Sequence, residues 1–464
     1  DNHTSLLYSL SYITIIKQTV KEVFMDRILI KDIDNYFDKQ VTVKGWVETI
    51  RDQKKMQFLV LRDHSGKIQL TNMKKDDETT RNISKCSLES CVTVTGVLVK
   101  APNVKLGQKE IFVESFEIEN LAEPLLPLDV VGNTEDVSLD HRLDWRYLDL
   151  RKPDRLLIFQ VQTTAEMAMR EFWVQNGYIE LHSPKLTGNA TESGSEVFCM
   201  EYFDTKAYLA QSPQFYKQMA MSAGFDKVFE IGSVFRAEPS FTSRHATEFV
   251  SIDMEISWTK SHHEVMDEEE KWIKYFMQKI KEKHGKEIKE VFGEDIHIPE
   301  GAFPRIALSD AIKVLETEMG YQVPKKKKGD LDPEGERLLC EWAKKKHNSD
   351  FIFVIDYPVA ARPFYHMRHK DDRNLTMSFD LLWKGLELTT GAQREHRYEI
   401  LKKQVEESGM SVDGVQFYLD FFKYGCPPHG GLGFGLSRFL MKLLGLPSIK
   451  ESTFLFRGPN RLFP

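Results

Sequence analysis

A regular alternation of apolar and polar residues over positions 228–256 is the strongest constraint that the sequence places on the fold. Because successive side chains of an extended chain point to opposite faces, this period of two predicts a pair of strands joined by a loop at 239–246. One face would pack on a core through Val250, Ile252, Met254 and Ile256. The other face would carry Glu230, Gly232, Val234, Arg236, Glu238, Phe249, Ser251, Asp253 and Glu255. A sheet can expose such a face to solvent, but its mixture of charged, aromatic and glycine residues is also suited to holding a nucleotide.

The chain has 464 residues, of which 41% are hydrophobic and 29% charged, so it is long enough for two or three globular domains. Its five cysteines form no CxxC pair, which argues against a zinc ribbon or a disulfide framework and favours a reducing compartment. The apolar stretch at 6–16 is interrupted by Ser and Tyr and is too short to cross a bilayer. No membrane segment is therefore expected.

The formal net charge of −7 gives the chain no overall field that would attract nucleic acid, so any RNA contact must be local. Residues 26–120 hold 16 Lys and Arg against 15 Asp and Glu, a balance that only permits RNA binding. Five short alternating strands between 41 and 119 predict a small barrel, and such barrels often stack aromatic side chains on bases. Phe58 and Gln69 could serve in that way, although an aromatic residue in a strand more often packs inward.

A second domain is expected to begin after the Pro-containing segment 122–131. Residues 144–177 read as a long amphipathic helix ending at Gly177, and 178–186 as a strand in which Pro184 points to a sheet edge or an interface. Residues from 261 to about 289 are predicted as a charged helix and 302–343 as an α-rich insertion, and strands return from 350 onward.

Asp380 and Glu387 would lie on opposite faces of one continuous strand, but a tight reversal at Lys384 and Gly385 would let both carboxylates point into one cavity. Paired carboxylates beside a phosphate ligand are typical of a Mg²⁺ site, because this small hard cation prefers oxygen ligands. Two solvated acids on a hairpin are an equally open interpretation.

Gly433 and Gly435 would let the backbone approach a flat or charged ligand, and Arg438 follows at a helix start. The segment is not a dinucleotide fingerprint, because GxGxxG needs glycine where Arg438 stands. An arginine just inside a helix start instead favours an anion site.

Lys217 and Arg394 are two further cations. A single lysine or arginine is most often a charge on the protein surface. Together with Glu192, Gln214 and Asp253, they would form a pocket of mixed charge. Such a pocket is suited to a zwitterion with an additional carboxylate.

With these residues assembled, residues 41–464 resemble the class II aminoacyl-tRNA synthetases, specifically the aspartyl family of the archaeal and eukaryotic type. Motif 1 of the class resembles the helix after Asp154 and the strand with Pro184, motif 2 resembles FRAE with RHATEF, and motif 3 resembles GLGFGLSRF. The resemblance implies an α+β fold, with an N-terminal OB-fold β-barrel that reads the anticodon and an antiparallel catalytic sheet flanked by helices. The implied domains are the barrel at 26–120, a hinge at 121–150 and the catalytic domain at 151–464, with an insertion at about 261–345. Residues 1–25 match nothing that can be interpreted.

The resemblance also implies roles for single residues. Arg236 and Arg438 would be the catalytic cations, Arg236 bridging the substrate carboxylate and the α-phosphate and Arg438 holding the γ-phosphate. The implied ATP site comprises Arg236, Glu238, Arg244, His245, Phe249, Glu387, Gly433, Gly435 and Arg438. The implied Mg²⁺ ligands are Asp380, Glu387 and Thr390, the last of which stands where relatives generally have serine. The implied aspartate site comprises Glu192, Ser212, Gln214, Lys217, Arg236, Asp253, Thr390 and Arg394, and the implied anticodon readers are Phe58, Gln69 and Glu110.

The activity implied by the resemblance is aspartyl-tRNA synthesis by a cytoplasmic homodimer. L-Aspartate and ATP would form aspartyl-adenylate and pyrophosphate, and aspartate would then pass to the 3′-terminal ribose of tRNA(Asp). An asparaginyl-tRNA synthetase is the nearest alternative, against which the lysine of SPQFYKQ argues, because the side-chain carboxylate of aspartate would satisfy Lys217 and Arg394 where an amide would not. A non-catalytic RNA-binding paralogue is a second alternative, and whether tRNA(Asn) is also charged stays open.

Overall fold

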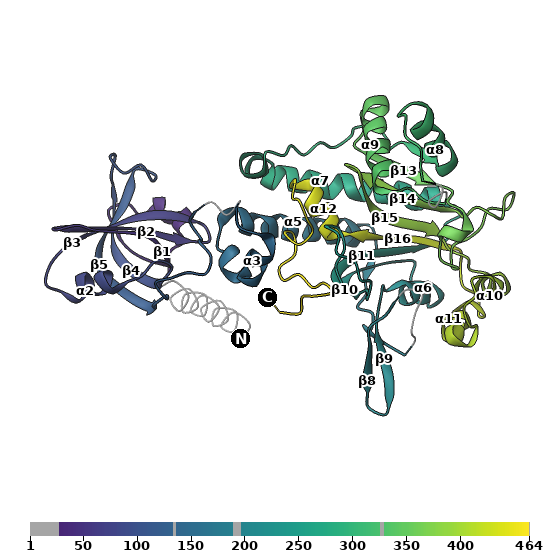
Figure 1. Ribbon diagram of the computed structural model, residues 1–464, viewed down its shortest axis with the longest axis horizontal. Coiled ribbons are helices and arrows are strands. Elements are labelled where there is room, and N and C mark those ends of the chain that lie inside the picture. Colours follow the sequence, from purple (N-terminus) through teal and green to yellow (C-terminus); the bar gives the residue numbers. More distant parts are fainter. Residues whose placement is uncertain (1–26, 133–135, 189–195, 325–328, 464) are drawn as a thin grey trace, which may run out of the picture. The chain divides into compact units, whose positions relative to one another are not determined.

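The computed structural model describes residues 27–132, 136–188, 196–324 and 329–463. The chain divides into two compact units, 1–156 and 157–464. Figure 1 shows a β-barrel in the first unit and a large sheet with helices in the second.

The first unit contains the predicted five-stranded barrel. Its strands are β1 (Gln40–Asp52), β2 (Met56–Asp63), β3 (Gly66–Met73), β4 (Cys91–Lys100) and β5 (Lys109–Asn120), closed in the order β1-β2-β3-β5-β4. The short helices are η1 (Ile30–Tyr36), α2 (Glu78–Lys85), α3 (Leu139–Asp144) and α4 (Arg146–Asp149). Alternate residues of each strand fill the barrel, as Leu59, Leu61, Ile68 and Leu70 illustrate. Their neighbours in sequence therefore face outward.

The second unit is built on an eight-stranded sheet in the order β12-β13-β14-β15-β16-β11-β10-β6. Its strands are β6 (Ile179–Glu180), β10 (Lys227–Phe235), β11 (Glu248–Ser257), β12 (Arg305–Ala307), β13 (Phe351–Ile355), β14 (Ser378–Trp383), β15 (Leu386–Gln393) and β16 (His429–Gly435). The pairs β12–β13 and β10–β6 are parallel and the other pairs are antiparallel. A separate small sheet contains β7 (Leu186–Thr187), β8 (Cys199–Tyr202) and β9 (Thr205–Leu209).

Two predicted elements differ in extent from those observed. The helix α5 (Pro153–Gln175) begins at Pro153 rather than at 144, because proline is well suited to the first helical position. The predicted strand 178–186 is broken around Pro184, which cannot donate a hydrogen bond to a ladder. Only Ile179 and Glu180 pair with β10, at the edge of the large sheet, and Leu186 belongs to the small one.

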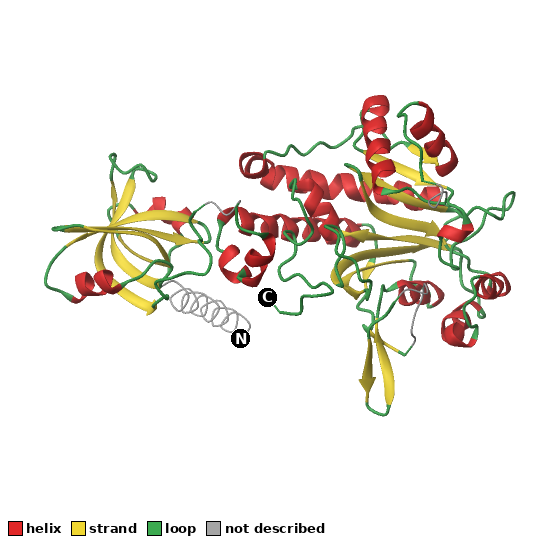
Figure 2. Cartoon of the chain, viewed as in Figure 1, coloured by secondary structure: helices red, strands yellow, loops and turns green. Residues whose placement is uncertain are grey.

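The helices α5 and α7 (His262–Phe292) cover one face of the sheet (Figure 2). Their contact includes Trp173 and Trp272, whose rings stack at 4.5 Å. Ile252 and Met254 of β11 are buried in the same core, as the alternation predicts, so Ser251 and Asp253 point to the opposite face. The remaining helices are α6 (Gln214–Ser222), α8 (Leu308–Thr317), α9 (Pro333–His347), η3 (Val359–Ala361), α10 (Tyr398–Glu407), η4 (Asp413–Val415), α11 (Gln416–Leu419), η5 (Asp420–Phe422) and α12 (Leu436–Leu443).

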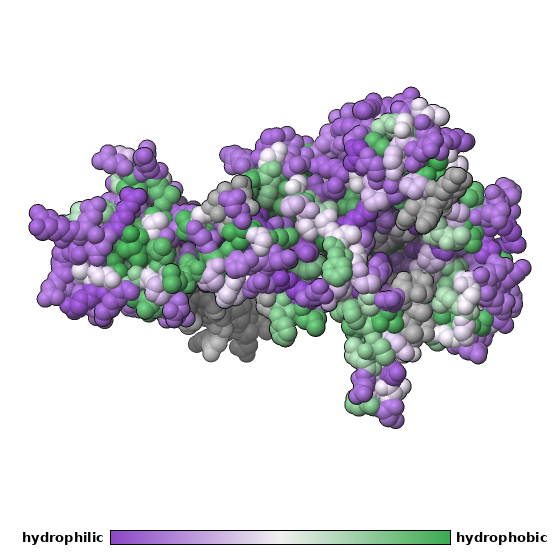
Figure 3. All heavy atoms as spheres, in the orientation of Figure 1, coloured by the Kyte–Doolittle hydropathy of each residue, from purple (hydrophilic) through white to green (hydrophobic). Residues whose placement is uncertain are grey.

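Hydrophilic residues dominate the face of each unit that Figure 3 presents, with smaller hydrophobic patches between them. Within the described ranges, no helix is long and apolar enough to span a membrane.

Glu269 of α7 is a buried acid with a testable consequence for stability. It is fully buried in the core, where the hydroxyl of Thr389 is its polar neighbour. Burial raises the pKa of Glu269 from 4.5 to about 8. Between these values the folded chain keeps a proton that the unfolded chain has released, so Glu269 lowers the free energy of unfolding progressively as pH rises from about 5 to 8.

We expect Glu269→Gln, which mimics the protonated carboxyl, to match the wild type near pH 5 and to be more stable near pH 8. The difference should reach the order of a few kcal/mol. Thermal unfolding of both proteins across this pH range measures it, and the other titrating groups cancel in the comparison. A difference that stays constant with pH would contradict the assignment.

Candidate active site

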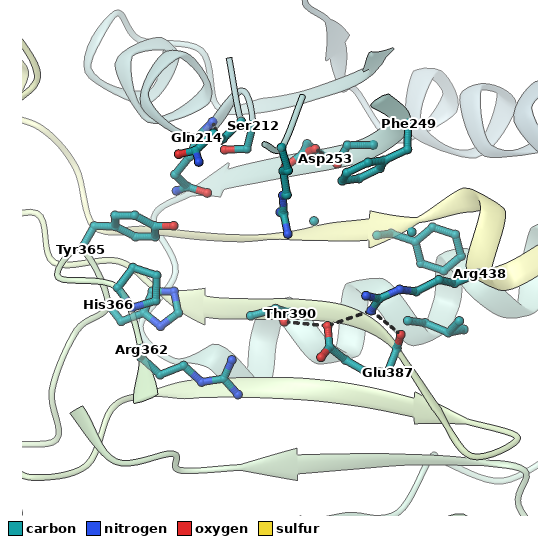
Figure 4. A pocket seen from close by; sticks show the side chains of 18 of the residues that line it. Ser212, Gln214, Phe249, Asp253, Arg362, Tyr365, His366, Glu387, Thr390 and Arg438 are labelled. Atoms are coloured by element: carbon teal, nitrogen blue, oxygen red, sulfur yellow. Dashed lines mark hydrogen bonds and ion pairs between the residues drawn. The ribbon is translucent and has the colours of Figure 1, made fainter. Parts of the chain in front are cut away.

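A cavity of about 340 Å³ opens on the face of the large sheet that bears Ser251 and Asp253 (Figure 4). It is lined from the neighbouring strands β15, β16 and β11, by residues before and at the start of α6, by Arg438 of α12, and by the segment 362–366. The predicted residues that line it are Ser212, Gln214, Arg236, Phe249, Asp253, Glu387, Thr390, Arg394, Gly433, Gly435 and Arg438. Glu192 lies outside the described residues.

Lys217 lies beneath the cavity rather than on its wall. Its Nζ donates to Asp253 Oδ1 at 3.0 Å and to the main-chain oxygen of Leu432 at 2.8 Å. The lysine and the aspartate side chains are only 3% and 4% exposed. That Asp253 orients Lys217 stays a prediction, and the structure places the two side chains in direct contact.

Glu255, to which the sequence analysis gave no role, joins the two cations expected to recognise the substrate. Its Oε1 accepts from Arg394 Nε at 2.9 Å, and its Oε2 lies 3.4 Å from Lys217 Nζ. Burial would raise the pKa of Glu255, but Arg394 and Lys217 hold it below its usual value. Gly431 makes room for this carboxylate, because a Cβ there would lie 2.2 Å from Glu255 Oε2. Each of the two cations is therefore paired with a buried carboxylate, within the pocket of mixed charge that the sequence predicts.

His366 adds a second contact to Arg394. Burial, reinforced by Arg394, holds the pKa of His366 well below its usual value, so the ring is neutral at pH 7. A neutral imidazole can accept a hydrogen bond, and Arg394 NH1 lies 3.1 Å from His366 Nε2. The guanidinium is thus held in one orientation by Glu255 and His366, and Arg394 lines the cavity.

The hairpin β14–β15 brings the predicted metal ligands together. Lys384 and Gly385 form the reversal, both with positive φ (48° and 79°), as a two-residue hairpin turn requires. Thr390 Oγ1 lies 2.8 Å from Asp380 Oδ1 and 3.3 Å from Glu387 Oε1. Burial, and then the charge of Asp380, raise the pKa of Glu387. Two adjacent carboxylates of this kind, one buried at Asp380 and one 35% exposed at Glu387, are stabilised by a nearby cation.

Arg362, which sequence reasoning missed, supplies one such cation. Its NH2 donates to Asp380 Oδ2 at 2.5 Å, and its guanidinium lies 3.6 Å from the centre of the Tyr357 ring. Burial opposes its charge, but Asp380 keeps the pKa of Arg362 above its usual value. One oxygen of Asp380 is therefore already occupied by an arginine.

A second, smaller cavity of about 50 Å³ adjoins the first. It is lined by the predicted ATP residues Arg236, Glu238, Arg244, His245, Phe249, Gly435 and Arg438. Four of these, Arg236, Phe249, Gly435 and Arg438, line both cavities, so the two cavities are adjacent. The guanidinium of Arg236 lies 5.4 Å from the centre of the Phe249 ring. Arg438 NH1 donates to the main-chain oxygen of Glu387 at 3.1 Å.

The outer surface of the barrel groups the three predicted anticodon readers. Phe58 and Gln69 lie on the neighbouring strands β2 and β3, and Glu110 on β5 is paired with Gln69 in register. Gln69 Nε2 donates to Glu110 Oε2 at 2.8 Å, and Thr71 Oγ1 donates to the same oxygen. Phe112, which the sequence analysis did not single out, follows on the same face and is 40% exposed. The rings of Phe58 and Phe112 and the hydrogen-bonded pair of Gln69 and Glu110 make this surface suitable for binding unstacked bases.

Comparisons with known proteins agree with both units. The family model for class II tRNA synthetases (D, K and N) matches residues 138–457, and that for an OB-fold nucleic acid binding domain matches 41–119. The chain is 42% identical to an aspartate–tRNA(Asp/Asn) ligase of Aeropyrum pernix and 40% identical to an aspartate–tRNA(Asp) ligase of Pyrococcus abyssi. Each alignment covers 92% of this chain and 96% of the relative.

Among solved structures, an asparaginyl-tRNA synthetase from Pyrococcus horikoshii complexed with asparaginyl-adenylate has a TM-score of 0.85 and 32% identity, over 94% of this chain and 99% of that one. The predicted α+β fold, an OB-fold barrel followed by a class II catalytic domain, is thereby confirmed. The chain belongs to the class II tRNA synthetases, which use ATP, and within the D, K and N group its sequence places it with the aspartate–tRNA ligases.

Proposed function

We propose that the second unit joins L-aspartate to ATP, forming aspartyl-adenylate and pyrophosphate, and then transfers aspartate to the 3′-terminal ribose of tRNA(Asp). The observation that carries this proposal is that the two adjacent cavities share four lining residues. The larger cavity is lined by groups that can bind the ammonium and carboxylate groups of an amino acid. The smaller cavity is lined by cations that would bind phosphate, and Arg236 borders both cavities.

This position gives Arg236 its proposed role. The amino-acid carboxylate attacks the α-phosphorus in line and pyrophosphate leaves, so catalysis requires positioning and charge neutralisation rather than a protein nucleophile. Arg236 would neutralise charge where carboxylate and α-phosphate meet, and Arg438 would hold the departing phosphates. Phe249, which borders both cavities, would stack on the adenine.

The residues of the β14–β15 hairpin fit Mg²⁺. Asp380, Glu387 and Thr390 offer the oxygen atoms that this cation prefers. Burial, and then the negative charge of Asp380, raise the pKa of Glu387. The ion would neutralise charge on the triphosphate. Because Arg362 holds Asp380 Oδ2, Glu387 and the other Asp380 oxygen are the anionic groups left to bind it.

Selectivity for aspartate is proposed to rest on Arg394, with Lys217 and Glu255 behind it. A bound side-chain carboxylate would join this fixed ionic network as an acceptor, whereas the amide of asparagine would turn donors toward donors. Pyrophosphate exchange measured with both amino acids tests this, and exchange with asparagine alone would assign the chain to the asparagine-specific alternative. Absence of exchange with either would support the non-catalytic alternative.

Charging assays with tRNA(Asp) and tRNA(Asn) test the second step. The curated relatives include both aspartate–tRNA(Asp) and aspartate–tRNA(Asp/Asn) ligases, so the two transcripts must be compared directly.

The barrel is proposed to read the anticodon through Phe58, Gln69 and Glu110. We expect Phe58→Ala to weaken tRNA binding by about tenfold or more, since stacking of one base contributes roughly 1–3 kcal/mol. Because Phe58 lies in the first unit, aspartate-dependent pyrophosphate exchange should not change. The tRNA KM for aminoacylation measures the effect, and Arg81→Ala, an exposed change on α2, serves as the control. Equal tRNA KM values for Phe58→Ala and the wild type would refute the assignment.

We also propose a cytoplasmic homodimer. Met167, Val174, Ile179 and Leu186 are 67%, 63%, 51% and 47% exposed, which is unusual for such apolar residues. Met167 and Val174 lie seven residues apart on α5 and so share a face, and the other two follow in the motif 1 segment. A second copy that covers this strip would remove it from water. Sedimentation of the full chain at micromolar concentration measures the assembly.

A further inference from the structure

An ion pair joins the ATP end of the site to the inserted segment. Arg244 belongs to the loop after β10, whereas Glu336 lies in the first turn of α9. Arg244 NH1 lies 3.2 Å from Glu336 Oε2, and the two side chains are 24% and 11% exposed. Because Leu339 and Cys340 of α9 are buried against Ile352 and Leu382 of the large sheet, Glu336 is attached to a fixed part of the fold.

The loop that carries Arg244 has no regular secondary structure of its own between β10 and β11. Its backbone is fixed at Ser243, whose oxygen accepts from Ile449 N at 2.9 Å and from Ser448 Oγ at 3.1 Å. The side chain of Arg244 is held separately from the loop backbone. Within the described residues, its ion-pair partner is Glu336. Arg244 also lines the small cavity together with His245 and Arg438, so its remaining donors are available there.

We propose that Glu336 is a positioning residue for ATP, which holds the Arg244 guanidinium ready to receive phosphate oxygens. An arginine side chain free in solvent loses rotamer entropy when it binds a ligand, and a carboxylate that fixes one nitrogen beforehand removes part of this cost. The planar guanidinium offers donors on two edges, so one can bind Glu336 and the other a phosphate. The insertion thereby forms part of the nucleotide site. This inference rests on the proposed function.

The test compares Glu336→Gln with the wild type by pyrophosphate exchange. Burial, and then Glu387, raise the pKa of Glu336 to about 7, so pH 8 ensures that the wild-type carboxyl is ionised. We expect the KM for ATP to rise about tenfold, as for loss of one charged hydrogen bond. Both kcat and the KM for aspartate should stay within about twofold, because only the positioning of ATP changes. Glu341→Gln, on the same helix with a side chain 45% exposed, is the matched control.

A double-mutant cycle distinguishes this role from a structural one. If Glu336 acts through Arg244, then Arg244→Gln should weaken ATP binding and the additional change Glu336→Gln should have little further effect. Equilibrium dialysis of ATP against each variant gives the same comparison without relying on catalysis. Additive effects, an unchanged KM for ATP, or equal rises for both substrates with a lower unfolding temperature would each overturn the inference. Wild-type protein that binds ATP but exchanges no pyrophosphate would instead refute the proposed function.

Discussion

Replacing Arg438 by alanine is expected to lower aspartate-dependent pyrophosphate exchange by about 10²–10³-fold, the usual cost of losing one fixed charge-stabilising donor. Arg438 lines both cavities, and its side chain is 24% exposed. Its NH1 lies 3.1 Å from the main-chain oxygen of Glu387 and 3.4 Å from its side chain. These contacts lie at the ligand end of the site rather than in the core, so the fold should persist.

Exchange rates at saturating aspartate and ATP measure the effect, and sedimentation with thermal unfolding shows whether assembly and fold survive. Arg373→Ala, which removes an exposed arginine in a turn, is the control for loss of positive charge. If Arg438→Ala lost exchange only in proportion to lost folded protein or lost assembly, Arg438 would have a structural role instead.

Lys217→Ala is expected to raise the KM for aspartate by about 10²-fold or more, since truncating one member of a buried charge network costs roughly 2–5 kcal/mol. Lys217 holds Asp253 at 3.0 Å and lies 3.4 Å from Glu255, which in turn orients Arg394. Its removal would leave two buried carboxylates with one fewer cation, so the pocket would repel an incoming carboxylate. The phosphate end of the site would be untouched.

The KM values for aspartate and ATP, measured in the same exchange assay, separate these effects. Lys206→Ala removes an exposed lysine of β9 and should change neither value. Equal losses for aspartate and ATP would mean that Lys217 supports the whole fold rather than the amino-acid pocket.

Local patterns in the sequence predicted the parts of the fold that depend on local geometry. The barrel strands and the hairpin of β10 and β11 follow from alternation, since a period of two directly determines which side chains share a face. The convergence of Asp380 and Glu387 followed from Lys384 and Gly385, because few residue pairs adopt positive φ in succession. The order of strands in the large sheet could not be predicted in this way, because pairing depends on contacts between residues distant in sequence.

The same limit explains which site residues were missed. Alternation placed Glu255 on the correct face, but it could not show that cations from α6 and from the end of β15 would meet there. Arg362 and His366 belong to a mostly irregular segment that has no period, and their partners Asp380 and Arg394 come from the neighbouring strands. The assigned roles of the predicted residues came from the family resemblance, because spacing alone does not distinguish a ligand from a solvated charge.

The strand order also has a kinetic consequence. Residues from Gln211 to Arg438 line one cavity. They meet because β16 pairs with β11, although more than a hundred residues lie between these two strands in the chain, and β15 pairs with the other edge of β16. Closing such long loops is slow, so the last pairings of the sheet should limit the rate of refolding. Recovery of substrate binding after dilution from denaturant should therefore lag behind recovery of helical content, and would report when the domain has finished assembling.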